Sequence, residues 1–325
     1  MPSPHSSDIP FYDLVIIGAG LSGCAFADQL RHTSLSILVV DKSRGTGGRA
    51  SSKRLEHGSC ELGAVQIKLE HKTLEELKAR LLANGTIAPW QQGFVGVPRM
   101  STVCRDLLGD TAIQTGARIH HLERNEQGDW LIRDDNYHPI ARCRYLVLAT
   151  PATQAAMLLA TTQGQAELLQ AAYDASALTV PQWAMWFTMP KKIQQPVLQE
   201  FADHRLLQRL VCDSSKPGRS ALDGEQIWVA QTRADWSKAH LNSPRDTIKQ
   251  AIINGVQDHF GTEIFAAGEP HRWLLGQQSG VVSDQPYLVN DTKNLWLIGD
   301  WLCQGDGEGA LVSATFAAQE FLASL

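Results

Sequence analysis

The chain has 325 residues, of which 43% are hydrophobic, and its formal net charge at pH 7 is −5. This length predicts about two domains, and the hydrophobic content is sufficient for a sizeable buried core. The small negative charge provides no basic field that would recruit nucleic acid or an anionic membrane, so neither is an expected partner.

The start of the chain and its cysteines indicate the cellular compartment of the protein. The first ten residues are polar and proline-rich, without the apolar core of a secretory leader, and no later stretch has the uninterrupted apolar length of a membrane-spanning helix. Six dispersed cysteines without a C-x-x-C pair favour reduced thiols. No spacing of His, Cys and carboxylate residues indicates a metal site. We therefore expect a cytoplasmic protein without a metal ion. Both a monomer and a dimer are open, because the sequence does not fix the oligomeric state.

A glycine-rich turn near the start of the chain is the most informative motif. Phe11–Ile17 is apolar enough for a strand buried on both faces, and it leads into G-A-G-L-S-G at 18–23. Gly18 permits a tight turn, Gly20 lets a pyrophosphate approach, and Gly23 lets the next helix pack closely. A second strand ends at Asp41, whose carboxylate can accept hydrogen bonds from a ribose. This pattern predicts a dinucleotide site but does not choose between NAD and FAD.

The segment D-K-S-R-G-T-G-G-R at 41–49 follows directly. Its glycines free the backbone, and Arg44 and Arg49 can neutralise a pyrophosphate. Taken alone, the segment is typical of a flexible basic surface loop. Its position immediately after Asp41 favours contact with the dinucleotide instead.

The end of the chain predicts a second motif of the same kind. Leu295–Ile298 is an apolar strand followed by Gly299 and Asp300, a glycine-rich loop, E-G-A at 308–310 and a helix with small residues on its packing face. An ordinary strand and helix at a domain terminus is the alternative interpretation.

These motifs resemble those of the FAD-dependent amine oxidase superfamily, and their residue sequence is most similar to that of the renalases. The likeness rests on 18–23, 41–49 and G-D-W…E-G-A near the end, with shorter matches at 61–64, 98–101, 149–152 and 271–273. It implies an α/β fold, with a Rossmann-like, p-hydroxybenzoate-hydroxylase-like FAD-binding domain beside an α+β substrate domain. It also implies oxidation of 2- or 6-dihydro isomers of NAD(P), with hydride transfer to flavin N5 and O2 reduced to hydrogen peroxide.

The resemblance assigns roles to particular residues. Asp300 would bind the ribityl or pyrophosphate region, and the N–H groups near Gly309 and Ala310 would face the flavin edge that gains negative charge. Trp301 would offer the substrate a flat face and His271 a polar edge, although a structural histidine at a strand end fits His271 equally well. The implied FAD contacts are Gly18, Gly20, Leu21, Ser22, Gly23, Asp41, Lys42, Arg44, Gly48, Arg49, Gly63, Ala64, Thr150, Gly299, Asp300, Glu308, Gly309 and Ala310.

The implied division of the chain is discontinuous. Residues 10–66, 96–152 and 276–325 would form the FAD-binding domain, and residues 67–95 and 153–275 the substrate domain. In the second of these, Trp183, Met185 and Phe187 alternate along a strand. Such a row either lines a substrate wall or belongs to the core, and the spacing favours the core.

Two segments depart from the family pattern and keep other functions open. The family's G-A-Q-Y-F-T is here G-A-V-Q-I-K at 63–68, without the aromatic pair, and the family's glycine before Met-Ser is Arg99. One alternative is a flavin amine oxidase acting on a small amine, which would need an aromatic cage. The other is a non-catalytic FAD-binding protein whose pocket is closed by Arg99 and Lys68.

Overall fold

An eight-stranded sheet is the centre of the computed structural model, which describes residues 9–56, 58–191, 195–219, 224–281 and 283–325. Its five parallel strands are β1 (Phe11–Ile17), β2 (Ile37–Asp41), β7 (Ala112–Thr115), β10 (Pro139–Leu148) and β18 (Leu295–Leu297). The antiparallel additions are β8 (Ile119–Arg124), β9 (Trp130–Asp134) and β17 (Leu288–Val289). The order β18-β10-β1-β2-β7 places the glycine-motif strand in the middle of the sheet.

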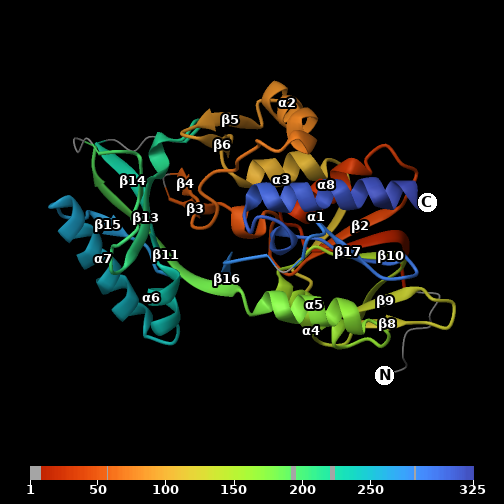
Figure 1. Ribbon diagram of the computed structural model, residues 1–325. Helices are drawn as coiled ribbons and strands as arrows, with labels where there is room; N and C mark the ends of the chain where they lie inside the picture. The colour runs from red at the N-terminus through yellow and green to blue at the C-terminus, as the bar shows by residue number, and fades with distance from the viewer. Residues whose placement is uncertain (1–8, 57, 192–194, 220–223, 282) are drawn as a thin grey trace.

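Helices cover both faces of this sheet, as Figure 1 shows. The side chains of Leu14 and Ile16 pack with α1 (Leu21–Gln29), α3 (Ser101–Leu108) and α8 (Gly307–Ala323). Those of Val15 and Ile17 point the other way and pack with α4 (Ala152–Leu159) and α5 (Ala166–Ser176). The unbroken apolar run Leu14–Ile17 is what burial on both faces requires. The Rossmann-like α/β prediction is confirmed.

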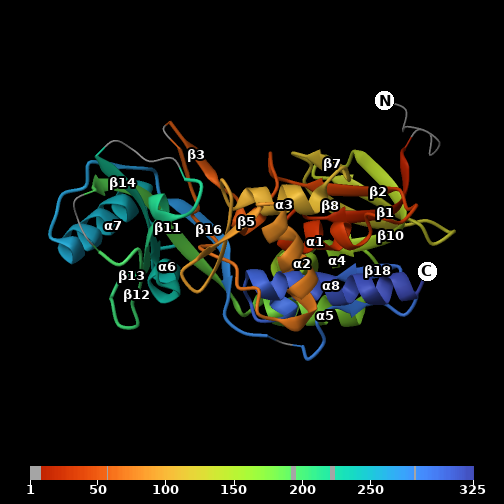
Figure 2. The same cartoon turned by 90° about the horizontal axis from the view of Figure 1, so that it is seen from above.

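The second lobe is built on a six-stranded antiparallel sheet. Its strands are β11 (Thr179–Pro190), β12 (Leu198–Glu200), β13 (Leu207–Cys212), β14 (Glu225–Thr232), β15 (Ala266–Ala267) and β16 (His271–Gln278), and α6 (Ala234–Ala239) and α7 (Arg245–Phe260) pack on one face. Trp183, Met185 and Phe187 point into the core under α7, so the alternating row is core rather than substrate wall. Figure 2 shows the two lobes side by side from above.

The packing divides the chain at slightly different places from the implied domain boundaries. Helices α4 and α5 share a core with β1 and β10, although residues 153–176 were expected in the substrate domain. Strand β16 pairs with β11 along its length, so the expected boundary at 275 falls inside one strand. An apolar helix can pack on either of the two sheets. The Ala- and Leu-rich composition of residues 153–176 did not indicate which sheet α4 and α5 would cover.

Small elements connect the lobes. The hairpin of β3 (Lys53–Leu55) and β4 (Gly58–Cys60) lies between the two sheets in Figure 1. A helix, α2 (Glu75–Ala83), and a second hairpin, β5 (Ile87–Trp90) and β6 (Gly93–Gly96), lead to α3. Short 3₁₀ turns are found at 48–50, 72–74, 213–215 and 300–302.

The described residues contain no membrane-spanning helix, metal-binding cluster or disulfide. None of their helices has both the length and the apolar character needed to cross a membrane, and no three of their His, Cys, Asp or Glu residues are grouped to hold a metal ion. The six cysteines are free thiols, and five of them are buried. Residues 1–8, which contribute most of the leader expectation, lie outside the described ranges.

Candidate functional site

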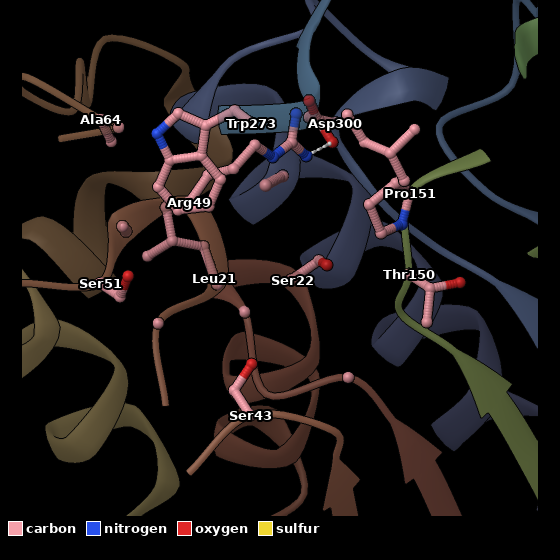
Figure 3. A pocket seen from close by; sticks show the side chains of 18 of the residues that line it. Leu21, Ser22, Ser43, Arg49, Ser51, Ala64, Thr150, Pro151, Trp273 and Asp300 are labelled. Atoms are coloured by element: carbon pink, nitrogen blue, oxygen red, sulfur yellow. Dashed lines mark hydrogen bonds and ion pairs between the residues drawn. The ribbon is translucent and has the colours of Figure 1, made fainter. Parts of the chain in front are cut away.

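A cleft of about 2180 Å³ lies at the carboxyl edge of the parallel strands. The loops after β1, β2, β10 and β18 all leave the sheet at this edge because these strands are parallel. The second lobe supplies the opposite wall through strands β11, β13, β14 and β16. Figure 3 shows the part of the cleft where Arg49, Trp273 and Asp300 approach one another.

The three motif glycines serve different purposes in the turn after β1. Gly18 has φ +114°, and a Cβ there would overlap the carbonyl oxygen of Ala149. A Cβ on Gly23 would overlap the carbonyl oxygen of Gly18, so the close packing expected of Gly23 is present. A Cβ on Gly20 would meet nothing within 4 Å. Only Gly20 therefore borders free space, at the uncapped N-terminus of α1 where backbone N–H groups favour an anion.

The carboxylate of Asp41 joins the two glycine-rich loops. Its Oδ2 accepts from the N–H of Ala19 at 2.7 Å, and its Oδ1 accepts from the N–H of Ser43 at 2.7 Å. Each carboxylate oxygen can accept a second hydrogen bond, and Asp41 lines the cleft. The carboxylate therefore fixes the turn and still presents acceptors to the cleft.

The arginine loop is bound to three separated parts of the chain. The N–H of Gly47 donates to the carbonyl of Ala19 at 2.8 Å, and the Arg49 carbonyl accepts from the N–H of Ala64 at 2.8 Å. The guanidinium Nη2 of Arg49 lies 2.5 Å from Oδ1 of Asp300. These contacts gather most predicted cofactor residues around the cleft, which is also lined by Leu21, Ser22, Lys42, Arg44, Gly48, Gly63, Thr150, Gly299 and Ala310.

Two predicted cofactor contacts of the last motif, Glu308 and Gly309, do not line the cleft. The carboxylate of Glu308 is buried and accepts from the N–H groups of Glu70 at 2.5 Å and His71 at 2.7 Å. The N–H of Gly309 donates to Oδ1 of Asp306, which caps α8, at 2.8 Å. Asp306 is a typical N-cap residue, and this signal could have predicted that the Gly309 N–H bonds to the cap of α8 rather than to a ligand. Gly307 and Ala310 line the cleft instead.

The aromatic face of the cleft is Trp273 rather than Trp301. Trp301 is 1% exposed, donates from Nε1 to the Thr150 carbonyl at 3.1 Å, and is not among the residues that line the cleft. Trp273 is half-buried and lines the cleft, and its Nε1 donates to the Leu62 carbonyl at 3.1 Å. The H-R-W segment contained this signal, since His271 and Trp273 are two residues apart on one strand and so share a face.

We expect alanine substitutions of these two tryptophans to differ in stability. Trp301→Ala should lower the free energy of unfolding by about 3–5 kcal/mol, because it empties a fully buried site. Trp273→Ala should cost about 1–2 kcal/mol, since the ring is partly solvated. Urea unfolding followed by fluorescence measures both, and equal losses would contradict the assignment of Trp273 to the cleft wall.

His271 lies at the outer part of the same wall. Its ring packs edge-on against Trp273, with centroids 4.3 Å apart and planes at 68°. Burial and the nearby charges of Lys53 and Arg245 lower the pKa of His271 below its usual value, so the ring is neutral at pH 7. His271 therefore places an uncharged polar group beside Trp273 in the lining of the cleft.

Glutamine side chains form much of the second-lobe wall, which sequence reasoning missed. The amides of Gln182 and Gln277 both donate to Oε1 of Gln208, at 2.9 and 2.8 Å, and Gln231 donates to the Gly63 carbonyl at 2.6 Å. All four glutamines line the cleft. The available signal was a glutamine next to a run of apolar residues in a strand, as at Gln182 and Gln231.

A buried charge cluster links the lobes beside the cleft. Nζ of Lys216 lies 3.0 Å from Oε2 of Glu61 and 2.6 Å from Oδ1 of Asp213, and Nη2 of Arg219 lies 2.8 Å from Glu61. All four side chains are at most 2% exposed. Burial raises the pKa of Glu61, but Lys216 and Arg219 outweigh it and hold that pKa well below its usual range. The cluster fixes the segment that carries Gly63 and Ala64 against the second lobe.

Comparison with known proteins places the first motif in a recognised context. Residues 16–81 match a family model described as an NAD(P)-binding Rossmann-like domain. The chain is 41% identical over 69 residues to Protein anon-37Cs of Drosophila lebanonensis and 36% identical over 66 residues to "Probable flavin-containing monoamine oxidase A" of Dictyostelium discoideum. Each match covers 20% of this chain, and only 13% and 14% of those relatives.

The likeness to solved structures extends over the whole chain. Cyclohexylamine oxidase from Brevibacterium oxydans IH-35A superposes with a TM-score of 0.70, covering 97% of this chain and 99% of that chain. The sequence identity is 14%, so this comparison establishes a shared two-lobed fold.

Proposed function

We propose that this protein is an FAD-dependent oxidoreductase. The observation that carries the proposal is the combination, in one cleft, of two dinucleotide motifs from opposite ends of the chain with an aromatic and amide wall from a second lobe. The short sequence matches support it, since one of the two relatives is named a flavin-containing oxidase. The fold supports it as well, because the enzyme named in the whole-chain comparison is an amine oxidase.

The residues of the cleft fit such a cofactor. Gly20 borders open space at the N-terminus of α1, where a pyrophosphate would receive backbone N–H groups. The hydroxyl of Thr150 is buried with no hydrogen-bond partner among the described residues, as expected of a group that awaits a ligand. Asp41 would hold the adenosine ribose, and Arg49 with Asp300 the pyrophosphate and ribityl region.

A bound FAD supplies a two-electron acceptor for hydride from a reduced substrate. The protein's part is to position that substrate and to exclude water. Trp273 offers a flat face to a planar ring, and the neutral His271 a polar edge. A dihydropyridine becomes aromatic when it loses hydride, so no side chain has to remove a proton.

We propose isomeric dihydronicotinamides, the 2- and 6-dihydro forms of NAD(P), as the reducing substrates. The amides of Gln182 and Gln208 support this choice. Among the described residues no hydrogen bond uses the Nε2 donors of Gln208 or the Oε1 acceptor of Gln182, and a substrate carboxamide can pair with both kinds of group. With O2 as electron acceptor, the net reaction converts the dihydro form, one proton and O2 into NAD(P)⁺ and hydrogen peroxide.

A flavin amine oxidase is the second candidate, and the overall fold favours it equally. An amine oxidase of the expected kind would enclose the amine in an aromatic cage. Among the described residues that line the cleft, Trp273 is the one Trp, Tyr or Phe side chain. That wall supports the dihydronicotinamide proposal over the amine.

An anaerobic reduction experiment tests both candidates. The purified protein should show a flavin spectrum, and borohydride-derived isomers of NADH should bleach it rapidly, whereas normal NADH should not. Reduction by small amines but by no isomer would favour the second candidate. Absence of flavin, even after reconstitution, would contradict the FAD proposal altogether.

A further inference from the structure

The cleft carries far more positive than negative charge. Its described lining residues include ten Lys or Arg and four Asp or Glu side chains, although the whole chain has a net charge of −5. The pyrophosphate of one dinucleotide carries two negative charges and would neutralise only part of this excess. The charge distribution therefore predicts a second anionic group in the cleft.

Three of these cations are grouped near β3 and α3. Arg54 is on β3, Arg99 lies two residues before the start of α3, and Arg105 is on α3; all three line the cleft. Arg49 and Arg219 pair with carboxylates, but within the described ranges none of the three does. Grouped, unpaired guanidinium ions repel one another, and a bound anion would relieve that repulsion.

Arg99 shows the strongest sign of a missing partner. Its Nε is buried, and no described residue accepts a hydrogen bond from it. Burial and the charges of Arg105 and Arg54 lower the pKa of Arg99, with Glu61 opposing them. A guanidinium nitrogen left without an acceptor is costly unless a ligand supplies one.

The backbone on both sides of Arg99 is held from beneath by the buried charge cluster. Nη1 of Arg219 donates to the carbonyls of Gly96, at 3.0 Å, and Pro98. Oε1 of Glu61 accepts from the N–H of Met100 at 3.2 Å. Since the segment around Arg99 is already ordered, binding an anion there costs little conformational entropy of the protein.

We propose that Arg54, Arg99 and Arg105 form a phosphate-binding subsite, and that the reducing substrate carries a phosphate or pyrophosphate group. Guanidinium groups bind phosphate oxygens through paired, charge-assisted hydrogen bonds. The same cations repel a protonated amine, so the subsite also separates the two candidate substrate classes. The inference rests on the proposed function for the redox-active half of the substrate and adds its anionic half.

A binding experiment tests the subsite without any turnover. Inorganic pyrophosphate is titrated calorimetrically into the flavin-loaded protein, so that the cofactor already occupies its cradle. Wild type should bind it, and Arg99→Gln should raise the Kd at least tenfold, as should Arg105→Gln, an exposed position that serves if the first variant folds poorly. Arg118→Gln makes the same charge change in the same cleft, but Arg118 pairs with Asp135 at 3.9 Å and should alter the Kd less than twofold.

Two results would overturn the subsite. One is absence of pyrophosphate binding by the wild type, and the other is equal affinity in wild type, Arg99→Gln and Arg105→Gln. Because the binding measurements need no reductant, they test the subsite independently of the proposed redox reaction.

Steady-state kinetics identify the source of the phosphate. For Arg99→Gln, the KM of a nucleotide reductant should rise about tenfold with kcat little changed, while the KM of the corresponding dephosphorylated riboside should stay constant. Loss of pyrophosphate binding without any change in the nucleotide KM would indicate a site for free anions, and would overturn the assignment to the substrate.

Discussion

Gly23→Ala should yield a protein that is strongly destabilised and retains no flavin. The added methyl group would overlap the carbonyl oxygen of Gly18, which is backbone and cannot rotate away. Helix α1 would have to move off the end of β1, where it packs in the core of the large sheet. We expect the free energy of unfolding to fall by about 3 kcal/mol or more, in the range of severe core disruptions. Urea unfolding and the visible flavin spectrum of the purified protein measure the two effects.

Gly20→Ala is the matched control, since it adds the same methyl group three residues earlier in the same turn. A Cβ at Gly20 meets nothing within 4 Å, and its backbone, at φ −79°, suits alanine. Stability should therefore change by less than about 1 kcal/mol. The methyl group would stand where the pyrophosphate approaches, so flavin affinity should fall at least tenfold. Retention of flavin at wild-type affinity in both variants would show that this turn does not hold the cofactor.

Lys216→Met should be the most destabilising single charge removal in the described part of the chain. It leaves Asp213 and Glu61 buried with Arg219 as their one remaining cation. Breaking a buried ion pair by removing one partner costs about 3–5 kcal/mol. Lys293→Met is the control, because its pair with Glu320 is exposed and should contribute less than about 1 kcal/mol.

The loss in Lys216→Met should depend on pH in a defined direction. Burial raises the pKa of Asp213 to about 6 while Lys216 opposes that rise, so the variant should titrate higher still. A carboxyl whose pKa is raised in the folded state costs stability at high pH, and this cost disappears as pH falls and the group binds a proton. Urea unfolding at pH 7.5 and pH 5.5 should show a smaller difference between variant and wild type at the lower pH. A larger difference at pH 5.5 would contradict this account of Asp213.

The nucleotide half of the cleft could be predicted because its signals are local. Gly18, Gly20 and Gly23 serve a turn within six residues, and Asp41 ends the next strand, so spacing alone defined their contacts. Parallel strands bring their carboxyl ends to one edge, which also placed Asp300 near Arg49. The confirmed α/β fold follows from the same apolar strands.

The other half of the cleft, where the second lobe contributes, could not be predicted, since its contacts join segments that are distant in the sequence. Glu61 meets Lys216 across more than 150 positions, and no local pattern links them. Trp301 and Trp273 are both tryptophans beside short motifs, and only the three-dimensional packing buries the first and leaves the second half-buried in the cleft wall. The side chain of Glu308 looked like a cofactor ligand, but it binds the backbone of a loop whose position the sequence does not reveal.

The charge cluster beneath the cleft also limits how the molecule can move. Glu61 belongs to the first lobe, and both of its cations, Lys216 and Arg219, belong to the second. A hinge that opened the lobes would draw these partners apart and leave a bare carboxylate, at a cost far above thermal energy. We therefore expect the segments that carry Glu61, Lys216 and Arg219 to stay joined while ligands enter and leave the cleft.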